Sequence, residues 1–228
     1  MTYVVIPAKG FKGAKQRLAT FLRPHERACL AQAMLTDTLT ACCRAQGLAG
    51  VGVVTCDRDV AKVVESLGAE VLWEPQAQGH SQAVAFGVHV CTQRGVTSML
   101  TMPADVPLLT AADVETIARV PTPPVPVVLV PNRDDLGTNA LRLSPPHCLP
   151  FAFGHDSFQR HLRLAAEHHL AVVVRRLPRV ALDIDAPEDL ALFAALQTPC
   201  QSLQVLTELG IVERLHALPV LPTHENIL

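Results

Sequence analysis

The sequence predicts a single α/β domain in which helices flank a mixed, mostly parallel sheet. Short β-rich runs alternate with helical stretches through the first half of the chain, and this alternation is typical of βαβ units. The chain has 228 residues, a length that suits one large domain. Because 49% of the residues are hydrophobic, such a domain has enough apolar side chains for a substantial core.

The first half of the chain predicts four strands and the helices that connect them. The strands are expected at residues 3–6, 51–55, 70–73 and 98–102. The helices are expected at residues 24–45, 58–67 and 81–94. Each helix is followed by a glycine, at Gly47, Gly68 and Gly95, and glycine is the usual residue just past the end of a helix.

The second half of the chain departs from this simple alternation. After a proline-rich connection at residues 121–126, the apolar runs 127–130 and 139–143 flank a polar turn at 132–137. This arrangement predicts a hairpin inserted in or beside the parallel sheet. A helix that begins near Ser157, a strand at 171–174 and a helix at 187–197 complete the predicted core.

The end of the chain differs in character, so we divide the sequence into a domain at residues 1–198 and an amphipathic extension at 199–228. Apolar residues recur in the extension at helical spacing, at Leu203, Leu206, Leu209, Val212 and Leu215. The apolar face that this spacing creates must be covered. Two alternatives remain: the extension packs back on its own domain, or it forms the contact of a homodimer.

Composition narrows the classes of partner. The formal net charge is −2 and no long basic run is present, which argues against nucleic acid, because phosphate backbones bind clustered Lys and Arg. No apolar stretch reaches the roughly eighteen residues that span a bilayer. The seven cysteines are scattered without a C-x-x-C pair, and the histidines lack zinc-binding spacing, so neither a disulfide framework nor a zinc site is expected. We therefore expect a cytoplasmic protein with small-molecule ligands.

Two acidic clusters carry the first indication of chemistry. Asp105 follows the apolar run at 98–102, and Asp183 and Asp185 follow another apolar run, so a buried strand is expected to deliver each cluster to the edge of the sheet. Residues i and i+2 of an extended segment point the same way, which places Asp183 beside Asp185. Three convergent carboxylates suit Mg²⁺, which proteins hold with carboxylates together with substrate phosphates.

Each acidic cluster can also be interpreted structurally. Asp185 precedes Pro187 and Glu188, a pattern in which Asp185 is only the N-cap of a helix. Asp105 has no such role, because Thr110 and Asp113 already supply the start signal of the next helix. The functional interpretation is therefore stronger for Asp105.

The predicted first strand ends in a basic loop at residues 7–18. This loop matches neither the P-loop pattern G-x-x-x-x-G-K-[ST] nor the dinucleotide pattern G-x-G-x-x-G. It holds two glycines and four cations, namely Gly10, Gly13, Lys9, Lys12, Lys15 and Arg17. Open α/β sheets bind ligands at such positions, where backbone N–H groups and basic side chains can hold a triphosphate. The alternative is a basic loop that is simply solvated.

Five blocks of the sequence occur in an order that matches a known family. They are Pro7-Ala8-Lys9 with Ala14-Lys15-x-Arg17-Leu18, Asp105-x-Pro107-Leu108-Leu109-Thr110, Gly137-Thr138-Asn139-Ala140-Leu141, Phe151-x-Phe153-Gly154-x-x-Ser157-Phe158, and Leu182-Asp183-x-Asp185-x-Pro187-x-Asp189-Leu190. With these blocks, residues 3–197 resemble the 2-phospho-L-lactate guanylyltransferase family. The resemblance implies a glycosyltransferase-A-like fold, related to nucleotide-diphospho-sugar transferases. It also implies GMP transfer from GTP to a small phosphorylated three-carbon acid, in the biosynthesis of the deazaflavin coenzyme F-420.

The resemblance further implies roles for individual residues. The expected Mg²⁺ ligands are Asp105, Asp183 and Asp185. The basic loop is expected to bind GTP through Lys9, Gly10, Gly13, Lys15 and Arg17, with Lys15, Arg17 and Asp105 acting in catalysis. The residues expected to hold the phosphorylated acid are Thr138, Gly154, Ser157 and Ser81. For Gly154 and Ser157 the alternative is a simple turn and helix cap.

One stretch departs from the family pattern. Where the family has Gly-Leu-Asn-Ala-Ala-Leu, this chain has Gly79-His80-Ser81-Gln82-Ala83-Val84. The new side chains add hydrogen-bonding groups, and a site that hydrogen-bonds a substrate hydroxyl discriminates against analogues without one. Among the family's acceptors only 3-phospho-D-glycerate carries a free hydroxyl. We therefore expect it to be preferred, with phosphoenolpyruvate or 2-phospho-L-lactate as lesser acceptors.

Two other functions remain as alternatives. The first is a molybdopterin or sugar-phosphate nucleotidyltransferase, which the absence of a denser glycine-rich first loop and the presence of the Gly154 and Ser157 block argue against. The second is a nucleotide-binding regulatory protein without catalysis, which the presence of all three carboxylates argues against.

Overall fold

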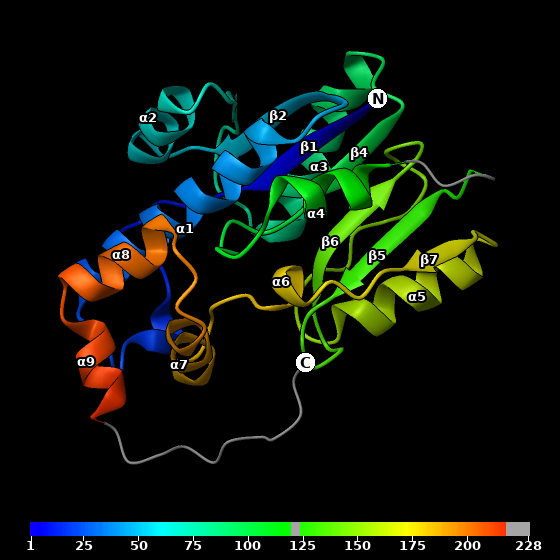
Figure 1. Cartoon of the computed structure of the whole chain (residues 1–228). Coiled ribbons are helices and arrows are strands. Elements are labelled where there is room, and N and C mark those ends of the chain that lie inside the picture. Colours follow the sequence, from blue (N-terminus) through cyan, green and yellow to red (C-terminus); the bar gives the residue numbers. More distant parts are fainter. Residues whose placement is uncertain (120–123, 218–228) are drawn as a thin grey trace.

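The centre of the structure is a seven-stranded mixed sheet (Figure 1). The computed structural model describes residues 1–119 and 124–217. The strands are β1 (Thr2–Pro7), β2 (Leu48–Thr55), β3 (Glu70–Trp73), β4 (Ser98–Thr101), β5 (Val127–Pro131), β6 (Thr138–Leu143) and β7 (Val172–Val174). Their order is β3-β2-β1-β4-β6-β5-β7, and β6 runs antiparallel to both of its neighbours while the other pairs are parallel. The predicted hairpin is therefore the β5–β6 pair, inserted in the sheet.

Helices cover both faces of this sheet, as the sequence predicts (Figure 1). They are α1 (Pro24–Arg44), α2 (Arg58–Ser66), α3 (His80–Gln93), α4 (Ala111–Ala118), α5 (Ser157–Glu167), α6 (Pro178–Ala181), α7 (Pro187–Ala195), α8 (Gln201–Glu208) and α9 (Ile211–His216), with a 3₁₀ helix η1 (Gln16–Leu18). α1, α2 and α4 share a core cluster on one face, and α3 and α5 belong to the clusters on the other face. The predicted bounds hold closely, except that β2 begins at Leu48 and that η1 and α6 were not predicted.

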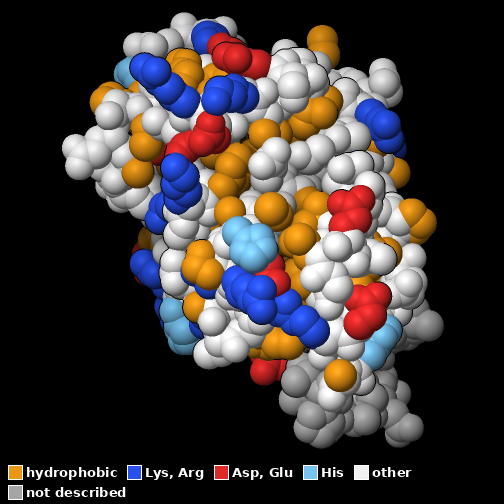
Figure 2. All heavy atoms as spheres, turned by 90° about the vertical axis from the view of Figure 1, so that its left-hand side faces the viewer, with side chains coloured by type: hydrophobic (Ala, Val, Ile, Leu, Met, Phe, Trp, Pro, Cys, Tyr) orange, Lys and Arg blue, Asp and Glu red, His pale blue; other side chains and the backbone are white. Residues whose placement is uncertain are grey.

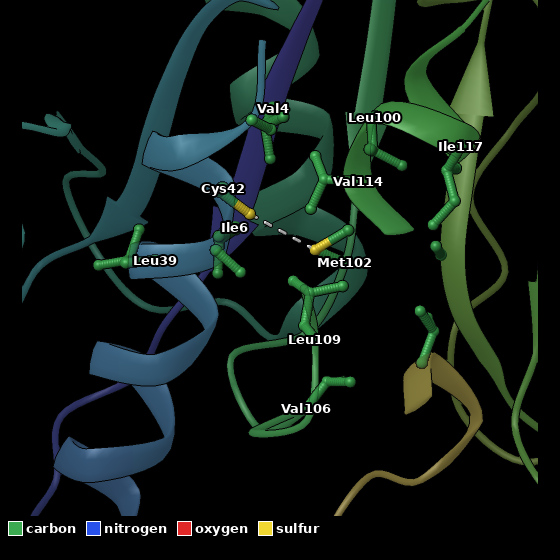
Figure 3. Packing of buried hydrophobic residues seen from close by; sticks show 14 of the residues in the cluster. Val4, Ile6, Leu39, Cys42, Leu100, Met102, Val106, Leu109, Val114 and Ile117 are labelled. Atoms are coloured by element: carbon green, nitrogen blue, oxygen red, sulfur yellow. Dashed lines mark hydrogen bonds between the residues drawn. The ribbon is translucent and has the colours of Figure 1, made fainter. Parts of the chain in front are cut away.

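The central strand β1 is buried on both faces, which explains its continuous apolar sequence. Val4 and Ile6 lie in the cluster under α1, where the thiol of Cys42 contacts Met102 Sδ at 3.7 Å (Figure 3). Fully burying such aliphatic side chains contributes about 1.5–3 kcal/mol each. The strand is therefore held firmly, and its end at Pro7 delivers the basic loop to a defined place.

α8 and α9 form a second core cluster with α1 and α7. Leu206, Ile211 and Leu215 are buried in this cluster, and α8 lies along α1 (Figure 1). Gly210, with a φ of 65°, divides the expected apolar repeat into two helices. The described part of the extension packs on its own chain, which is the first of the two alternatives. Residues 218–228, the remainder of the extension, lie outside the described residues.

Polar contacts also fasten the extension to the N-terminal part of the chain. The Asp37 carboxylate on α1 accepts hydrogen bonds from the backbone N–H and the hydroxyl of Ser202, at 2.8 and 2.6 Å. Arg214 on α9 donates to Glu26 Oε1 at 2.6 Å and to the carbonyl oxygen of Phe21 at 2.7 Å. Because Phe21 and Glu26 follow η1 closely, these bonds support the segment that carries the basic loop.

The expectations drawn from composition concern membrane-spanning helices, cysteines and surface charge. Within residues 1–119 and 124–217, every helix is too short or too polar to cross a bilayer. All seven cysteines lie in the described part of the chain as free thiols. On the face drawn in Figure 2, basic and acidic side chains are interspersed. Residues 121–123 of the proline-rich connection lie outside the described residues.

Candidate active site

A cavity of about 520 Å³ opens at the carboxyl ends of β1 and β4. Its walls are the basic loop, the loop that follows β4, and the segment that leads into α3. This is the edge at which open α/β sheets bind ligands. A volume of this size lies in the range of small-molecule sites.

The shape of the basic loop depends on its two glycines and on a buried arginine. A Cβ atom at Gly10 would lie 2.3 Å from the Asp57 carboxylate, and Gly13 has a φ of 78°. Arg27, which is buried on α1, donates to the carbonyl oxygens of Ala14 at 3.2 Å and Leu22 at 2.8 Å. Arg27 therefore fastens both the loop, at Ala14, and the segment just after it, at Leu22.

Lys15 is the one cation of this loop that is turned inward. Its Nζ donates to Asp105 and, at 2.9 Å, to Asp185 Oδ1. Burial lowers the pKa of Lys15, but the charges of Asp105 and Asp185 outweigh burial and raise that pKa above its ordinary value. Arg17 lies 3.7 Å from Asp185, while Lys12 is exposed. The solvated-loop alternative thus fits Lys12 and fails for Lys15.

The segment that carries Asp183 and Asp185 is not the buried strand that the sequence predicts. It follows the short helix α6, and β7 occupies the edge of the sheet beside β5. The backbone N–H of Ile184 instead donates a single bond of 3.2 Å to the carbonyl oxygen of Asp105. Leu182 and Ile184 are buried in the second core cluster, so the expected alternation of side chains holds without a strand ladder. This bond brings the two acidic clusters together.

The carboxylates repel one another. Burial, followed by the charges of Asp105 and Asp185, raises the pKa of Asp183 to about 6, although Asn139 Nδ2 donates to Asp183 Oδ1 at 3.0 Å. Asp105 Oδ1 is buried and, within residues 1–119 and 124–217, has no hydrogen-bond partner. Acidic oxygens of this kind are suited to a hard cation. In the same residues no three acidic, His or Cys side chains stand close enough to form a metal-binding group, and the Lys15 ammonium lies between two of the carboxylates.

The capping interpretation of Asp185 fails. The N-cap of α7 is Ala186, and Asp189 Oδ2 accepts the backbone N–H groups of Asp185 at 3.2 Å and Ala186 at 2.9 Å. Asp189 therefore does the capping and leaves the Asp185 carboxylate to Lys15. The expected start signal of α4 is confirmed, because Thr110 and Asp113 form a capping box.

A second group of predicted residues gathers where β6 begins. The Ser157 hydroxyl accepts the backbone N–H of Thr138 at 2.9 Å. Ser157 is the first residue of α5 and Asp156 is its N-cap, so the simple-cap alternative fails for Ser157. Gly154 has a φ of 113°, which favours glycine, and the space in front of it is open. Asn139, next to Thr138 on β6, links this group to Asp183.

Ser81 lies half-buried in the first turn of α3, away from the cavity wall, which is formed there by its neighbour His80. The His80 ring packs edge-on against the Phe153 ring, with 4.6 Å between the two ring centroids. Burial lowers the pKa of His80. Gln82 is exposed. Among His80, Ser81 and Gln82, the residues of this stretch that add hydrogen-bonding groups, only His80 lines the cavity.

Sequence reasoning missed three buried polar residues in this region, namely Asn139, His161 and Glu74. His161 lies four residues after Ser157 on α5, and this helical spacing was the available signal. Glu74, buried at the end of β3, also lines the cavity and was not singled out. The predicted residues themselves form two neighbouring groups: Asp105, Asp183 and Asp185 with the basic loop, and Thr138, Gly154 and Ser157.

Similar sequences identify the family of this chain. The family model described as "Guanylyl transferase CofC like" matches residues 2–215. A phosphoenolpyruvate guanylyltransferase of Conexibacter woesei is 42% identical over 190 residues, covering 83% of this chain and 85% of the relative. A 3-phospho-D-glycerate guanylyltransferase of Colwellia psychrerythraea is 36% identical over 198 residues, covering 87% of this chain and 93% of the relative.

Solved structures with low sequence identity share the fold. A putative nucleotide-diphospho-sugar transferase from Desulfovibrio desulfuricans has a TM-score of 0.76 at 14% identity, covering 94% of this chain and 98% of that one. A cytidylyltransferase from Leptospira borgpetersenii has a TM-score of 0.60 at 10% identity, covering 97% of this chain and 100% of that one. The predicted fold class is confirmed. With the family model matched over nearly the whole chain, this protein belongs to the CofC-like guanylyl transferase family.

Proposed function

We propose that this protein transfers GMP from GTP to the phosphate of a small three-carbon acid and releases pyrophosphate. The observation that carries the proposal is the position of Lys15, which is held between Asp105 and Asp185 at the wall of a nucleotide-sized cavity. An inward-facing cation among carboxylates suits the binding of a triphosphate together with a metal ion.

The basic loop is assigned to the triphosphate. Lys9, Lys15 and Arg17 supply positive charge, and Gly10 and Gly13 line the cavity, where the absence of a side chain would let a phosphate approach the backbone. As the triphosphate enters, Lys15 exchanges a carboxylate partner for a phosphate oxygen.

The chemical step is a displacement at the α-phosphorus of GTP. An oxygen of the acceptor's phosphate attacks, a new phosphorus–oxygen bond forms, and the bond to the β-phosphate bridging oxygen breaks with release of pyrophosphate. A phosphomonoester has a second pKa near 6, so this oxygen is already ionised at neutral pH and a general base is unnecessary. The protein's task is to align the two phosphates and to neutralise charge, for which Lys15 and Arg17 are suited.

The carboxylates fit Mg²⁺ by their chemistry. In the described part of the chain Asp105 Oδ1 has no hydrogen-bond partner, and burial beside the neighbouring carboxylates raises the pKa of Asp183, so a cation would find unsatisfied acidic oxygens here. Asp105, Asp183 and Asp185 would hold the ion, which when bound neutralises charge on the phosphates of the transition state.

The acceptor is assigned to the group formed by Thr138, Gly154 and Ser157. Relatives of this chain are named for phosphoenolpyruvate and for 3-phospho-D-glycerate, which supports an acceptor of this class. The preference for 3-phospho-D-glycerate that the sequence predicts now depends on His80 alone. The proposed metabolic role is the family's: formation of the GMP-activated acid for coenzyme F-420.

A panel assay tests the proposal. Each of four nucleoside triphosphates is combined with Mg²⁺ and each of the three candidate acids, and products are identified by mass and by pyrophosphate release. We expect a product only with GTP and at least one acid, and none when EDTA removes the metal. Product formation from another nucleoside triphosphate contradicts the proposal. So does the absence of product with all three acids.

A further inference from the structure

His161 is a fully buried histidine at the centre of the proposed acceptor group. Its Nδ1 lies 3.0 Å from the Thr138 hydroxyl oxygen, and its Nε2 lies 3.1 Å from the backbone nitrogen of Ala152. The ring also packs edge-on against the Phe153 ring, with 5.0 Å between the two ring centroids. Every polar atom of the ring is therefore engaged by the protein.

These contacts determine which ring nitrogen carries the proton. A backbone N–H can only donate, so Nε2 must accept the bond from Ala152 and cannot carry a proton. In a neutral imidazole the proton then lies on Nδ1, which donates to Thr138 Oγ1. The ring stays neutral, since burial, and then the charge of Arg160, lowers the pKa of His161 to about 4.

The bond from Nδ1 leaves the Thr138 hydroxyl hydrogen free to be donated elsewhere. The Ser157 hydroxyl is in the same condition, because it already accepts the backbone N–H of Thr138. Within residues 1–119 and 124–217, neither hydroxyl hydrogen has a protein acceptor. Two such donors, held side by side by the bond between the Thr138 N–H and the Ser157 hydroxyl, suit an anionic group.

We infer that His161 is a positioning residue that holds the Thr138 hydroxyl as a hydrogen-bond donor toward the anionic group of the acceptor. The inference rests on the proposed function for the identity of that group. His161 itself touches no substrate, because Thr138 lies between them. The tautomer that it requires can be measured without any substrate.

The first test is spectroscopic. Long-range ¹H–¹⁵N correlation spectra of the whole protein with ¹⁵N-labelled histidine distinguish the two tautomers from imidazolium, and the His161→Asn variant identifies the His161 signals. We expect protonated Nδ1 and unprotonated Nε2 at pH 7. Protonated Nε2, in either the other tautomer or imidazolium, overturns the inference.

The second test is a double-mutant cycle on the Michaelis constant of the acceptor. His161→Leu and Thr138→Val should each raise this KM by about tenfold or more, because each removes or misdirects a hydrogen bond to a charged group. In the Thr138→Val background, His161→Leu should add less than about twofold, because its effect passes through the hydroxyl. The KM for GTP should stay within about twofold throughout.

Two comparisons separate positioning from simple damage. His161→Asn keeps an amide N–H near the place of Nδ1 and should restore part of the acceptor KM, and Thr138→Ser should retain the donor. His168→Leu, exposed at the end of α5, is the matched control and should change neither constant.

The possible failures are distinguishable. Suppose that the wild type transfers GMP, but that the effects of His161→Leu and Thr138→Val on the acceptor KM multiply in the double variant, or that both substitutions also raise the KM for GTP. The positioning role is then wrong, while the guanylyltransferase proposal stands. If the wild type transfers GMP to no acid in the panel, the proposed function and the acceptor role of Thr138 are both overturned. A cycle that is non-additive for the acceptor alone, together with the expected tautomer, supports the inference.

Discussion

The basic loop and the group around Thr138 lie at the same edge of the sheet, but one is organised by charges and the other by neutral hydrogen bonds. Around the loop, Lys15 is paired with two carboxylates, and the pKa of Asp183 is raised to about 6 by burial and by neighbouring negative charge. Around Thr138, both ring nitrogens of the buried His161 are hydrogen-bonded within the protein, and the Ser157 hydroxyl accepts the backbone N–H of Thr138.

This difference concerns how each group is completed. Neutral buried hydrogen bonds are formed during folding, so under the proposed function the group around Thr138, the neutral half of the site, already has its binding geometry. Buried like charges are costly without a partner, so under the proposed function the basic loop and the three carboxylates, the charged half of the site, are completed only by their ligands. Substitutions of charged residues in the charged half should therefore change catalysis more than substitutions in the neutral half.

The largest effect is expected from the carboxylates. Asp105→Asn, Asp183→Asn and Asp185→Asn should each lower turnover by at least about a hundredfold, because a lost ligand misplaces the ion that stabilises transition-state charge. Turnover is measured at saturating Mg²⁺, with the exposed Asp134→Asn as the control. Near-normal turnover in all three variants would show that the charged half does not hold a metal.

Lys15 and Lys12 offer a matched pair within the basic loop. Lys15→Ala should weaken GTP binding and turnover by about tenfold or more, because a buried cation on triphosphate oxygens contributes more than a solvated one. Lys12→Ala, at an exposed position, should change either constant by less than about threefold. Steady-state kinetics with GTP as the varied substrate decide the matter, and equal small effects would mean that the loop is only a basic surface.

The neutral half should instead be sensitive to acid. The pKa of His161 is about 4 in the folded protein and near its ordinary 6.5 when unfolded, so between these values the unfolded state binds more protons. The free energy of unfolding then rises with pH across this window, by at most about 1.4 kcal/mol per pH unit from this group. The contribution is fully present above pH 6.5 and is lost as the pH falls toward 4.

Urea unfolding at several pH values measures that slope. His161→Asn should make the slope shallower between about pH 4.5 and 6.5, whereas His168→Asn, at an exposed position, should leave it unchanged. An unchanged slope in His161→Asn would mean that the buried histidine takes up its proton without cost.

The smallest effect is expected on acceptor preference. In competition among equimolar acceptors, 3-phospho-D-glycerate should give the main product, and His80→Leu should shift the product ratio toward phosphoenolpyruvate by about threefold to tenfold, since one hydrogen bond is at stake. Gln82→Ala, exposed on the same turn, is the control. If guanylyl-phosphoglycerate is a minor product of the wild type, the interpretation of this stretch is wrong even though the family assignment stands.

Local pattern in the sequence was enough for most of the architecture. The alternating elements through β4, the β5–β6 hairpin and the Thr110 capping box were all predicted, because strand and helix periodicity and caps depend on residues a few positions apart. The candidate carboxylates and the cations of the basic loop were also found by residue type and by family blocks.

Tertiary structure decided how these residues meet. The segment at Asp183 looked like a strand by composition, yet β7 takes the sheet edge beside β5, and a single bond from Ile184 to Asp105 joins the acidic clusters. The inward turn of Lys15 and the bond between His161 and Thr138 likewise join residues that are distant in sequence. Such contacts depend on the burial and hydrogen bonding of the whole fold, and no local period encodes them.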